Sequence, residues 1–191
     1  RTGDLTRVLD GIDAARDAGF VIKINMVALK GFNDLEILPM LEWCAAQGFD
    51  LSLIETMPLG TIDEDRTDRF LPLTRVQDEL AMRFTLLPST HRTGGPARYW
   101  QVQELGVRIG FISPLTANFC EGCNRIRVSA SGQLFMCLGH DDKVDLRTAV
   151  RSGDPDAVDA AVDLALGRKP RRHAFDLNTP ATMRHMSVTG G

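Results

Sequence analysis

Three cysteines near the middle of the chain, Cys120, Cys123 and Cys137, have the spacing of ligands that share one metal centre. Two thiols separated by two residues can turn toward the same centre across a tight turn, and a third that follows a strand and a turn can close another side of it. Three thiolates leave one iron of a cubane cluster without a protein ligand, so a substrate could bind there. The spacing therefore predicts a metal site with an open position.

The spacing alone leaves four interpretations of these cysteines open: an iron–sulfur site, a structural zinc site, a redox disulfide or a chance cluster of thiols. His140 follows Cys137 by three residues, so the pattern C-x2-C-x13-C-x2-H contains the four ligands of a closed zinc site. A non-enzymatic binding module stabilised by Cys3His zinc is therefore an alternative function. A zinc hydrolase that uses Glu55 as its general base is another.

Two arginines directly after the second cysteine add positive charge beside the predicted centre. Arg125 and Arg127 alternate on an expected strand, so their side chains lie on one face, either as a solvated edge or as a phosphate clamp. Lys23 and Asn25 share one face of another expected strand. They either reach solvent or face a ligand cavity.

The composition indicates a globular protein of one large domain, or a part-domain joined to a smaller one. The 191 residues are 43% hydrophobic and 25% charged, and no apolar run approaches the length of a membrane span. Nothing in residues 1–10 has the pattern of a secretory signal. The net charge of −3 argues against general nucleic-acid binding. Four cysteines in a clustered pattern favour a metal in a reducing compartment, hence the cytoplasm.

The elements that would position these residues begin with a helix from Leu5, a strand at 21–29 and a helix that ends near Gln47. Asn33 and Glu36 have the spacing of a capping box for that second helix. A strand at 51–57 completes a βαβ unit, which predicts a parallel sheet. Further along, the pattern predicts a helix at 74–82 and strands at 83–87 and 106–112.

The cysteine-containing part is expected to contain a hairpin at 129–138 that turns at Ser131-Gly132. Asp154 and Pro155 predict the start of a helix that runs to about Leu166. The basic run 167–173 is interpreted as a solvated segment after a helix end, with RNA contact as the alternative.

Together these features resemble a known family, the GTP 3′,8-cyclases of molybdenum cofactor biosynthesis. The resemblance is carried by four segments: Cys120–Arg127 with Cys137, Ile22–Asn25, Ile54–Gly60 and Met186–Gly191. It covers essentially the whole chain and corresponds to the carboxy-terminal part of the family. It implies a radical S-adenosylmethionine lyase that makes (8S)-3′,8-cyclo-7,8-dihydroguanosine 5′-triphosphate from GTP.

For the fold, the resemblance implies an α/β protein: the end of an incomplete (βα)6 TIM-like barrel followed by an α+β iron–sulfur domain. Residues 1–65 would be the last βα units of the barrel. Residues 66–191 would be the carboxy-terminal [4Fe-4S] and GTP-binding domain with its Gly-Gly tail.

For the site, the resemblance implies a [4Fe-4S] cluster whose open iron binds the guanine base, held by Cys120, Cys123 and Cys137. It implies that GTP is bound by Lys23, Arg125, Ile126 and Arg127. Met57 matches a residue that contacts S-adenosylmethionine. The catalytic positions that it implies are Arg125, Arg127, Gly190 and Gly191.

The chain also departs from the family pattern. The amino-terminal C-x3-C-x2-C motif of the first [4Fe-4S] cluster and the glycine-rich strand for S-adenosylmethionine are not in this sequence, where Cys44 is the only cysteine before Cys120. We therefore expect the chain to supply the GTP-binding half of the enzyme and to be inactive alone. Its parallel strand edges are expected to be covered by a missing amino-terminal half or by formation of a homodimer.

Overall fold

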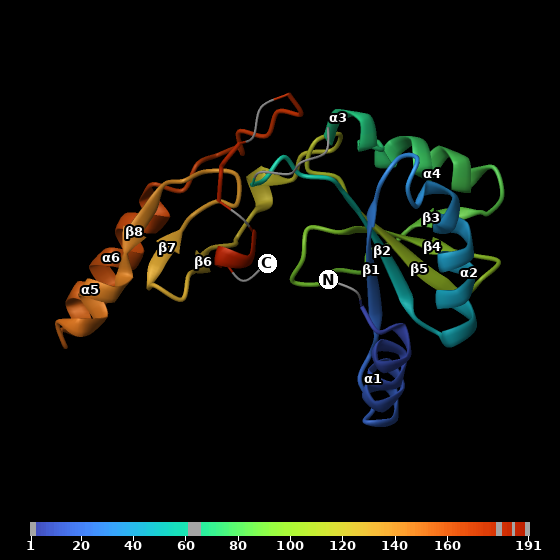
Figure 1. The fold of residues 1–191 in the computed structure, drawn as a ribbon, viewed down its shortest axis with the longest axis horizontal. Helices are drawn as coiled ribbons and strands as arrows, with labels where there is room; N and C mark the ends of the chain where they lie inside the picture. The colour runs from blue at the N-terminus through green and yellow to red at the C-terminus, as the bar shows by residue number, and fades with distance from the viewer. Residues whose placement is uncertain (1–2, 61–65, 179–180, 185, 190–191) are drawn as a thin grey trace. The chain divides into compact units, whose positions relative to one another are not determined.

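The computed structural model describes residues 3–60, 66–178, 181–184 and 186–189 of the 191-residue chain. It forms two compact units, of which the first consists of residues 1–55 and 70–116, and the second of residues 56–69 and 117–191. Both contain helices and strands, so the protein has a mixed α/β fold (Figure 1). The division into a barrel part at 1–65 and an iron–sulfur domain at 66–191 stays a prediction. The two compact units are defined by their internal contacts and carry no information on function.

A five-stranded sheet forms the centre of the first unit, with the strand order β1-β2-β5-β4-β3 (Figure 1). Its strands are β1 (Lys23–Ala28), β2 (Asp50–Glu55), β3 (Leu86–Pro88), β4 (Arg98–Val102) and β5 (Val107–Ile112). The three strands β1, β2 and β5 are parallel, whereas β4 and β3 return antiparallel. The predicted βαβ unit is thus confirmed.

The first unit also contains the helical segments α1 (Leu5–Asp17), the short η1 (Asp34–Glu36), α2 (Ile37–Gln47) and α4 (Leu73–Ala81). Of these segments, α2 and α4 contact strand β2 of this sheet. Leu41 of α2 is fully buried with Leu51 and Leu53 of β2. On β1, Lys23, Asn25 and Val27 are exposed while Met26 and Ala28 are buried, which confirms the predicted division of its two faces.

The predicted capping box of α2 is wrong. The side chain of Asn33 accepts a hydrogen bond from the Leu29 N–H at 2.8 Å and donates one to the Val27 carbonyl at 2.9 Å. Asn33 therefore closes the turn after β1 instead of capping a helix. The α-helix begins at Ile37, so Pro39 lies in its first turn, where a missing N–H costs nothing.

The second unit contains a three-stranded antiparallel sheet in the order β6-β7-β8. Its elements are α3 (Arg66–Arg69), η2 (Cys120–Gly122), β6 (Arg127–Val128), β7 (Gln133–Phe135), β8 (Lys143–Asp145), α5 (Leu146–Arg151), α6 (Pro155–Gly167) and η3 (Met186–Thr189). The turn predicted at Ser131-Gly132 and the predicted start of α6 are confirmed, but the paired strands of the hairpin are Arg127–Val128 and Gln133–Phe135 instead of 129–138. The Asp154 carboxylate accepts the Asp156 N–H at 3.0 Å. None of the described helices is long and apolar enough to cross a membrane.

Candidate functional site

The first two cysteines lie at either end of a tight turn. Cys120 opens the turn η2, and the Cys123 N–H donates to the Cys120 carbonyl at 3.0 Å. Cys137 follows β7 by two residues. All four cysteines of the chain are among the described residues and are free thiols; the three of this site are half-buried and Cys44 is buried in α2. The local geometry that the C-x2-C spacing predicts is therefore present.

Each of the three sulfurs has an N–H donor. The His173 backbone N–H donates to Cys120 Sγ at 3.4 Å, and Lys169 Nζ lies 3.8 Å from Cys123 Sγ. The Gly139 backbone N–H donates to the sulfur of Cys137. Donors aimed at sulfur favour the thiolate over the thiol, and the thiolate is the form that binds a metal.

Cys137 also shows that the three thiols are neighbours. Burial raises its pKa, the Gly139 N–H and the ammonium of Lys169 oppose the rise, and the nearby Cys120 and Cys123 add to it. Without an ion between them, three thiolates would repel one another. A positively charged core would relieve this repulsion.

A cavity of about 690 Å³ opens beside the first two cysteines. Cys120 and Cys123 line it together with Lys169, Arg171 and Arg172. The basic run is therefore not simply the solvated segment that the sequence suggests, since Lys169 is half-buried within it.

The two arginines continue the chain from Cys123 in an extended conformation. Arg125 lies before β6 and Arg127 is its first residue, and both are half-buried while Ile126 between them is exposed. Burial lowers the pKa of Arg127, the charge of Arg125 lowers it further, and the nearby thiols oppose this. Two cations this close to one another favour an anion beside them.

The other residues implied by the resemblance lie elsewhere. Lys23 belongs to the first unit, where its Nζ donates to the hydroxyl of buried Tyr99 at 3.4 Å. Met57 belongs to the second unit and is half-buried. Gly190 and Gly191 lie outside the described residues.

Comparison with known proteins identifies the family. Residues 49–175 match the family model described as Molybdenum Cofactor Synthesis C. The chain belongs to this family. The resemblance carried by the cysteine and arginine motif is thereby confirmed.

Curated members of the family align with the whole chain. A GTP 3′,8-cyclase of Agrobacterium fabrum is 55% identical over 196 residues, which cover 100% of this chain and 56% of that protein. A GTP 3′,8-cyclase of Erythrobacter litoralis is 56% identical over 195 residues, which cover 100% of this chain and 59% of that protein. The chain thus spans less than two thirds of the length of these relatives.

The family implies an iron–sulfur cluster, and the cysteine site has the chemistry to hold one. In the described part of the chain, no group of three His, Cys, Asp or Glu side chains is arranged to hold a single metal ion. The donor set nevertheless fits a thiolate-bound cluster, because each sulfur receives an N–H and an ammonium lies beside them.

The zinc alternative would use Nδ1 of His140 as its fourth ligand. His140 Nε2 lies 3.1 Å from the Arg172 carbonyl oxygen, which can only accept a hydrogen bond. Nε2 therefore carries the hydrogen, and Nδ1 keeps the lone pair that a metal would bind.

Glu55 is also unsuited to the role of general base. Its carboxylate is buried and accepts hydrogen bonds from the backbone N–H groups of Leu73, Leu115 and Thr116 at 3.0–3.2 Å, and from the Thr116 hydroxyl. These bonds occupy both oxygens, so the role of Glu55 is to join the end of β2 to the backbone at Leu73 and at Leu115 and Thr116.

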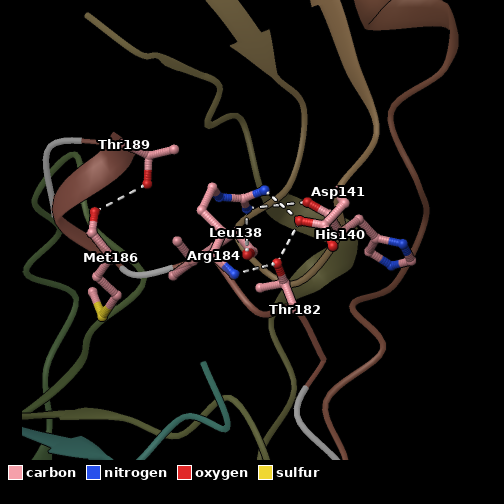
Figure 2. Close-up of polar contacts among 7 residues, drawn as sticks. All are labelled: Leu138, His140, Asp141, Thr182, Arg184, Met186 and Thr189. Carbon is pink, nitrogen blue, oxygen red and sulfur yellow. Dashed lines mark hydrogen bonds and ion pairs between the residues drawn. The ribbon is translucent and has the colours of Figure 1, made fainter. Parts of the chain in front are cut away.

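Sequence reasoning missed two residues, Lys169 and Arg184, that bond the backbone next to the cysteines in this chain. Lys169 appeared only as one charge in a basic run. Arg184 lies in the tail, and its side chain is 8% exposed. Figure 2 shows its guanidinium facing the loop that follows Cys137, where it bonds the carbonyls of Leu138 and His140. No local pattern in the sequence distinguishes either from a solvated cation.

Proposed function

We propose that this chain is the GTP-binding part of a GTP 3′,8-cyclase, the enzyme that converts GTP to (8S)-3′,8-cyclo-7,8-dihydroguanosine 5′-triphosphate in molybdenum cofactor biosynthesis. The observation that carries the proposal is the group of three thiols, each with an N–H donor, directly beside a half-buried pair of arginines. The family membership and the names of relatives 53–56% identical support it.

In this proposal Cys120, Cys123 and Cys137 hold a [4Fe-4S] cluster. When bound, the cluster supplies an iron without a protein ligand, which can bind and orient the guanine base. In the proposal, the donors of Lys169, His173 and Gly139 stabilise the three cysteine sulfurs as ligands of the cluster.

Arg125 and Arg127 then bind the triphosphate. A guanidinium forms two parallel hydrogen bonds to phosphate oxygens and remains charged at every physiological pH. Because both arginines are half-buried, their attraction for the phosphates is screened less than it would be on an open surface. Lys23 adds a further cation, and Ile126 contributes a backbone contact.

The remaining steps need groups beyond the cysteine and arginine site. Met57 would contact S-adenosylmethionine, and Gly190 and Gly191 would enter the active site as a strip without side chains. The first [4Fe-4S] cluster would come from the amino-terminal half. The parallel strands β1 and β2 would be the last strands of the incomplete (βα)6 TIM-like barrel. We expect the chain alone to bind GTP without turnover.

For cellular location, we propose the cytoplasm, since the four cysteines are free thiols suited to a reducing compartment. A homodimer stays a prediction.

Anaerobic reconstitution of the 191-residue chain with iron and sulfide tests the function. We expect about four iron and four sulfide per chain and a broad brown absorption. GTP should bind to this form, and Arg125→Ala and Arg127→Ala should weaken binding by roughly 10-fold or more each, as for charge-assisted hydrogen bonds of about 1.5–3 kcal/mol.

Arg151→Ala, at the exposed end of α5, is the matched control and should leave GTP binding unchanged. A colourless protein that contains only zinc and has no affinity for GTP would contradict the proposal.

A further inference from the structure

Lys169 lies two residues beyond the end of α6, and its ammonium points into the cysteine site. Nζ donates to the Met136 carbonyl at 2.6 Å and to the Arg125 carbonyl at 2.8 Å, and it lies 3.8 Å from Cys123 Sγ. An ammonium has three hydrogens and no acceptor. Two carbonyls and one sulfur therefore use its full donor capacity.

The two carbonyls lie just beyond the open end of the β6–β7 hairpin. The last paired residues of that hairpin are Arg127 and Phe135. Beyond this pair, the segment of Arg125 leads to Cys123 and the segment of Met136 leads to Cys137. Backbone pairing no longer joins the two segments there, and the ammonium of Lys169 joins them instead.

Lys169 is itself held by a strap, which we define as residues 169–175. Within the strap, the Arg172 carbonyl accepts the Nε2–H of His140 at 3.1 Å and the His173 N–H donates to Cys120 Sγ at 3.4 Å. The ring of Phe175 covers Gly139 so closely that a Cβ atom on that glycine would lie 2.6 Å from it. The strap thus contacts the surroundings of all three cysteines.

The charge of Lys169 adds to this geometry. Three thiolates bring negative charge to a half-buried site, and partners of the ligands commonly tune both metal affinity and reduction potential. A cation stabilises the more negatively charged, reduced state of a cluster more than the oxidised state.

We propose that Lys169 is a positioning residue that joins the two ligand-bearing segments and, through its contact with Cys123, sets the retention and the reduction potential of the cluster. The proposal rests on the proposed function, since it assumes that the three cysteines hold a cluster.

The test compares reconstituted Lys169→Met, Lys169→Arg and parent chains. Iron release to a chelator should be roughly 10- to 100-fold faster in Lys169→Met, the usual cost of losing a partner of a metal ligand. Its reduction potential should shift to more negative values. Lys169→Arg keeps the charge and should restore most of the potential, although its planar fork fits the two carbonyls less well.

Lys143→Met, at an exposed position of β8 in the same unit, is the matched control and should behave as the parent does. Parent-like iron release and potential in Lys169→Met would overturn the proposal. So would faster release with an unchanged potential in both Lys169 variants, because that result indicates packing alone. A parent chain that takes up no iron and sulfide would instead contradict the proposed function, and the role of Lys169 with it.

Discussion

Gly132 turns the hairpin that separates Cys123 from Cys137, and the structure leaves it no room for a side chain. Its φ is +75°, in the left-handed region that other residues adopt at a cost. A Cβ atom there would lie 2.5 Å from Cβ of Arg147, and the Gly132 carbonyl accepts the N–H groups of Leu146 and Arg147 at 3.0 Å. The turn therefore docks directly on the start of α5.

Gly132→Ala should destabilise the second unit by about 3 kcal/mol, the sum of backbone strain of about 1 kcal/mol and overpacking of about 2 kcal/mol. Gly153→Ala is the matched control, because Gly153 has a φ of +71° but nothing within 4 Å of the Cβ position. It should cost about 1 kcal/mol. Thermal unfolding by circular dichroism measures both, and equal losses would contradict the steric argument.

At the scale of elements, the sequence predicts those helices, strands and turns that are marked by apolar periodicity, a capping residue or a turn glycine. The apolar periodicity of β1, the N-cap of α6 at Asp154 and the turn at Gly132 all appear where they are expected. The parallel pairing of β2 with β5 joins residues more than fifty positions apart, as with Leu51 and Ile109. The spacing of apolar residues within one segment cannot predict which distant strand that segment pairs with.

In the candidate site, too, the sequence predicts some residues and not others. The cysteine and arginine motif is visible because its spacing is local. The contributions of Lys169 and Arg184 depend on carbonyl groups more than thirty residues away, and a backbone carbonyl leaves no trace in the sequence. Asn33 shows the converse, since its spacing to Glu36 predicts a capping box but its side chain closes the turn after β1 instead.

Arg184 joins the tail to the loop after Cys137. Its Nη1 pairs with Asp141 at 2.9 Å, and its Nη2 donates to the carbonyls of Leu138 at 2.9 Å and His140 at 3.1 Å (Figure 2). The guanidinium also lies 4.1 Å from the centroid of the Phe135 ring. The Asp141 side chain is 66% exposed, so water screens that ion pair and the carbonyl bonds matter more.

Arg184→Met should cost about 2 kcal/mol and raise hydrogen exchange in residues 181–184 and 138–141, because hydrogen bonds from a buried charged group are lost. Arg184→Lys should recover little, since an ammonium lacks the planar fork that reaches both carbonyls. Exchange measured by mass spectrometry checks this. Arg168→Met, an exposed arginine of the same unit, should leave the exchange unchanged. Slow exchange in Arg184→Met would show that other contacts hold the tail.

At the scale of the whole molecule, the chain passes from one unit to the other at residues 55/56, 69/70 and 116/117. Glu55 is the last residue of the first unit at the 55/56 boundary, and Thr116 is the last residue of the first unit at the 116/117 boundary. The Glu55 carboxylate is 0% exposed and accepts the N–H groups of Leu115 at 3.0 Å and Thr116 at 3.2 Å. One buried carboxylate thus ties together two of the points where the chain leaves the first unit.

Glu55→Ala should lower the free energy of unfolding of the first unit by about 3 kcal/mol. It leaves the N–H groups of buried Leu73 and half-buried Leu115 without an acceptor, at about 1–3 kcal/mol each. Tryptophan fluorescence in a denaturant titration measures this unit directly, since Trp43 packs on Phe49 and Trp100 on Phe111 within it. Glu42→Ala, exposed on α2, should change stability by less than about 0.5 kcal/mol. If the loss of stability in Glu55→Ala were as small as in Glu42→Ala, the hydrogen bonds of the Glu55 carboxylate would not stabilise the first unit.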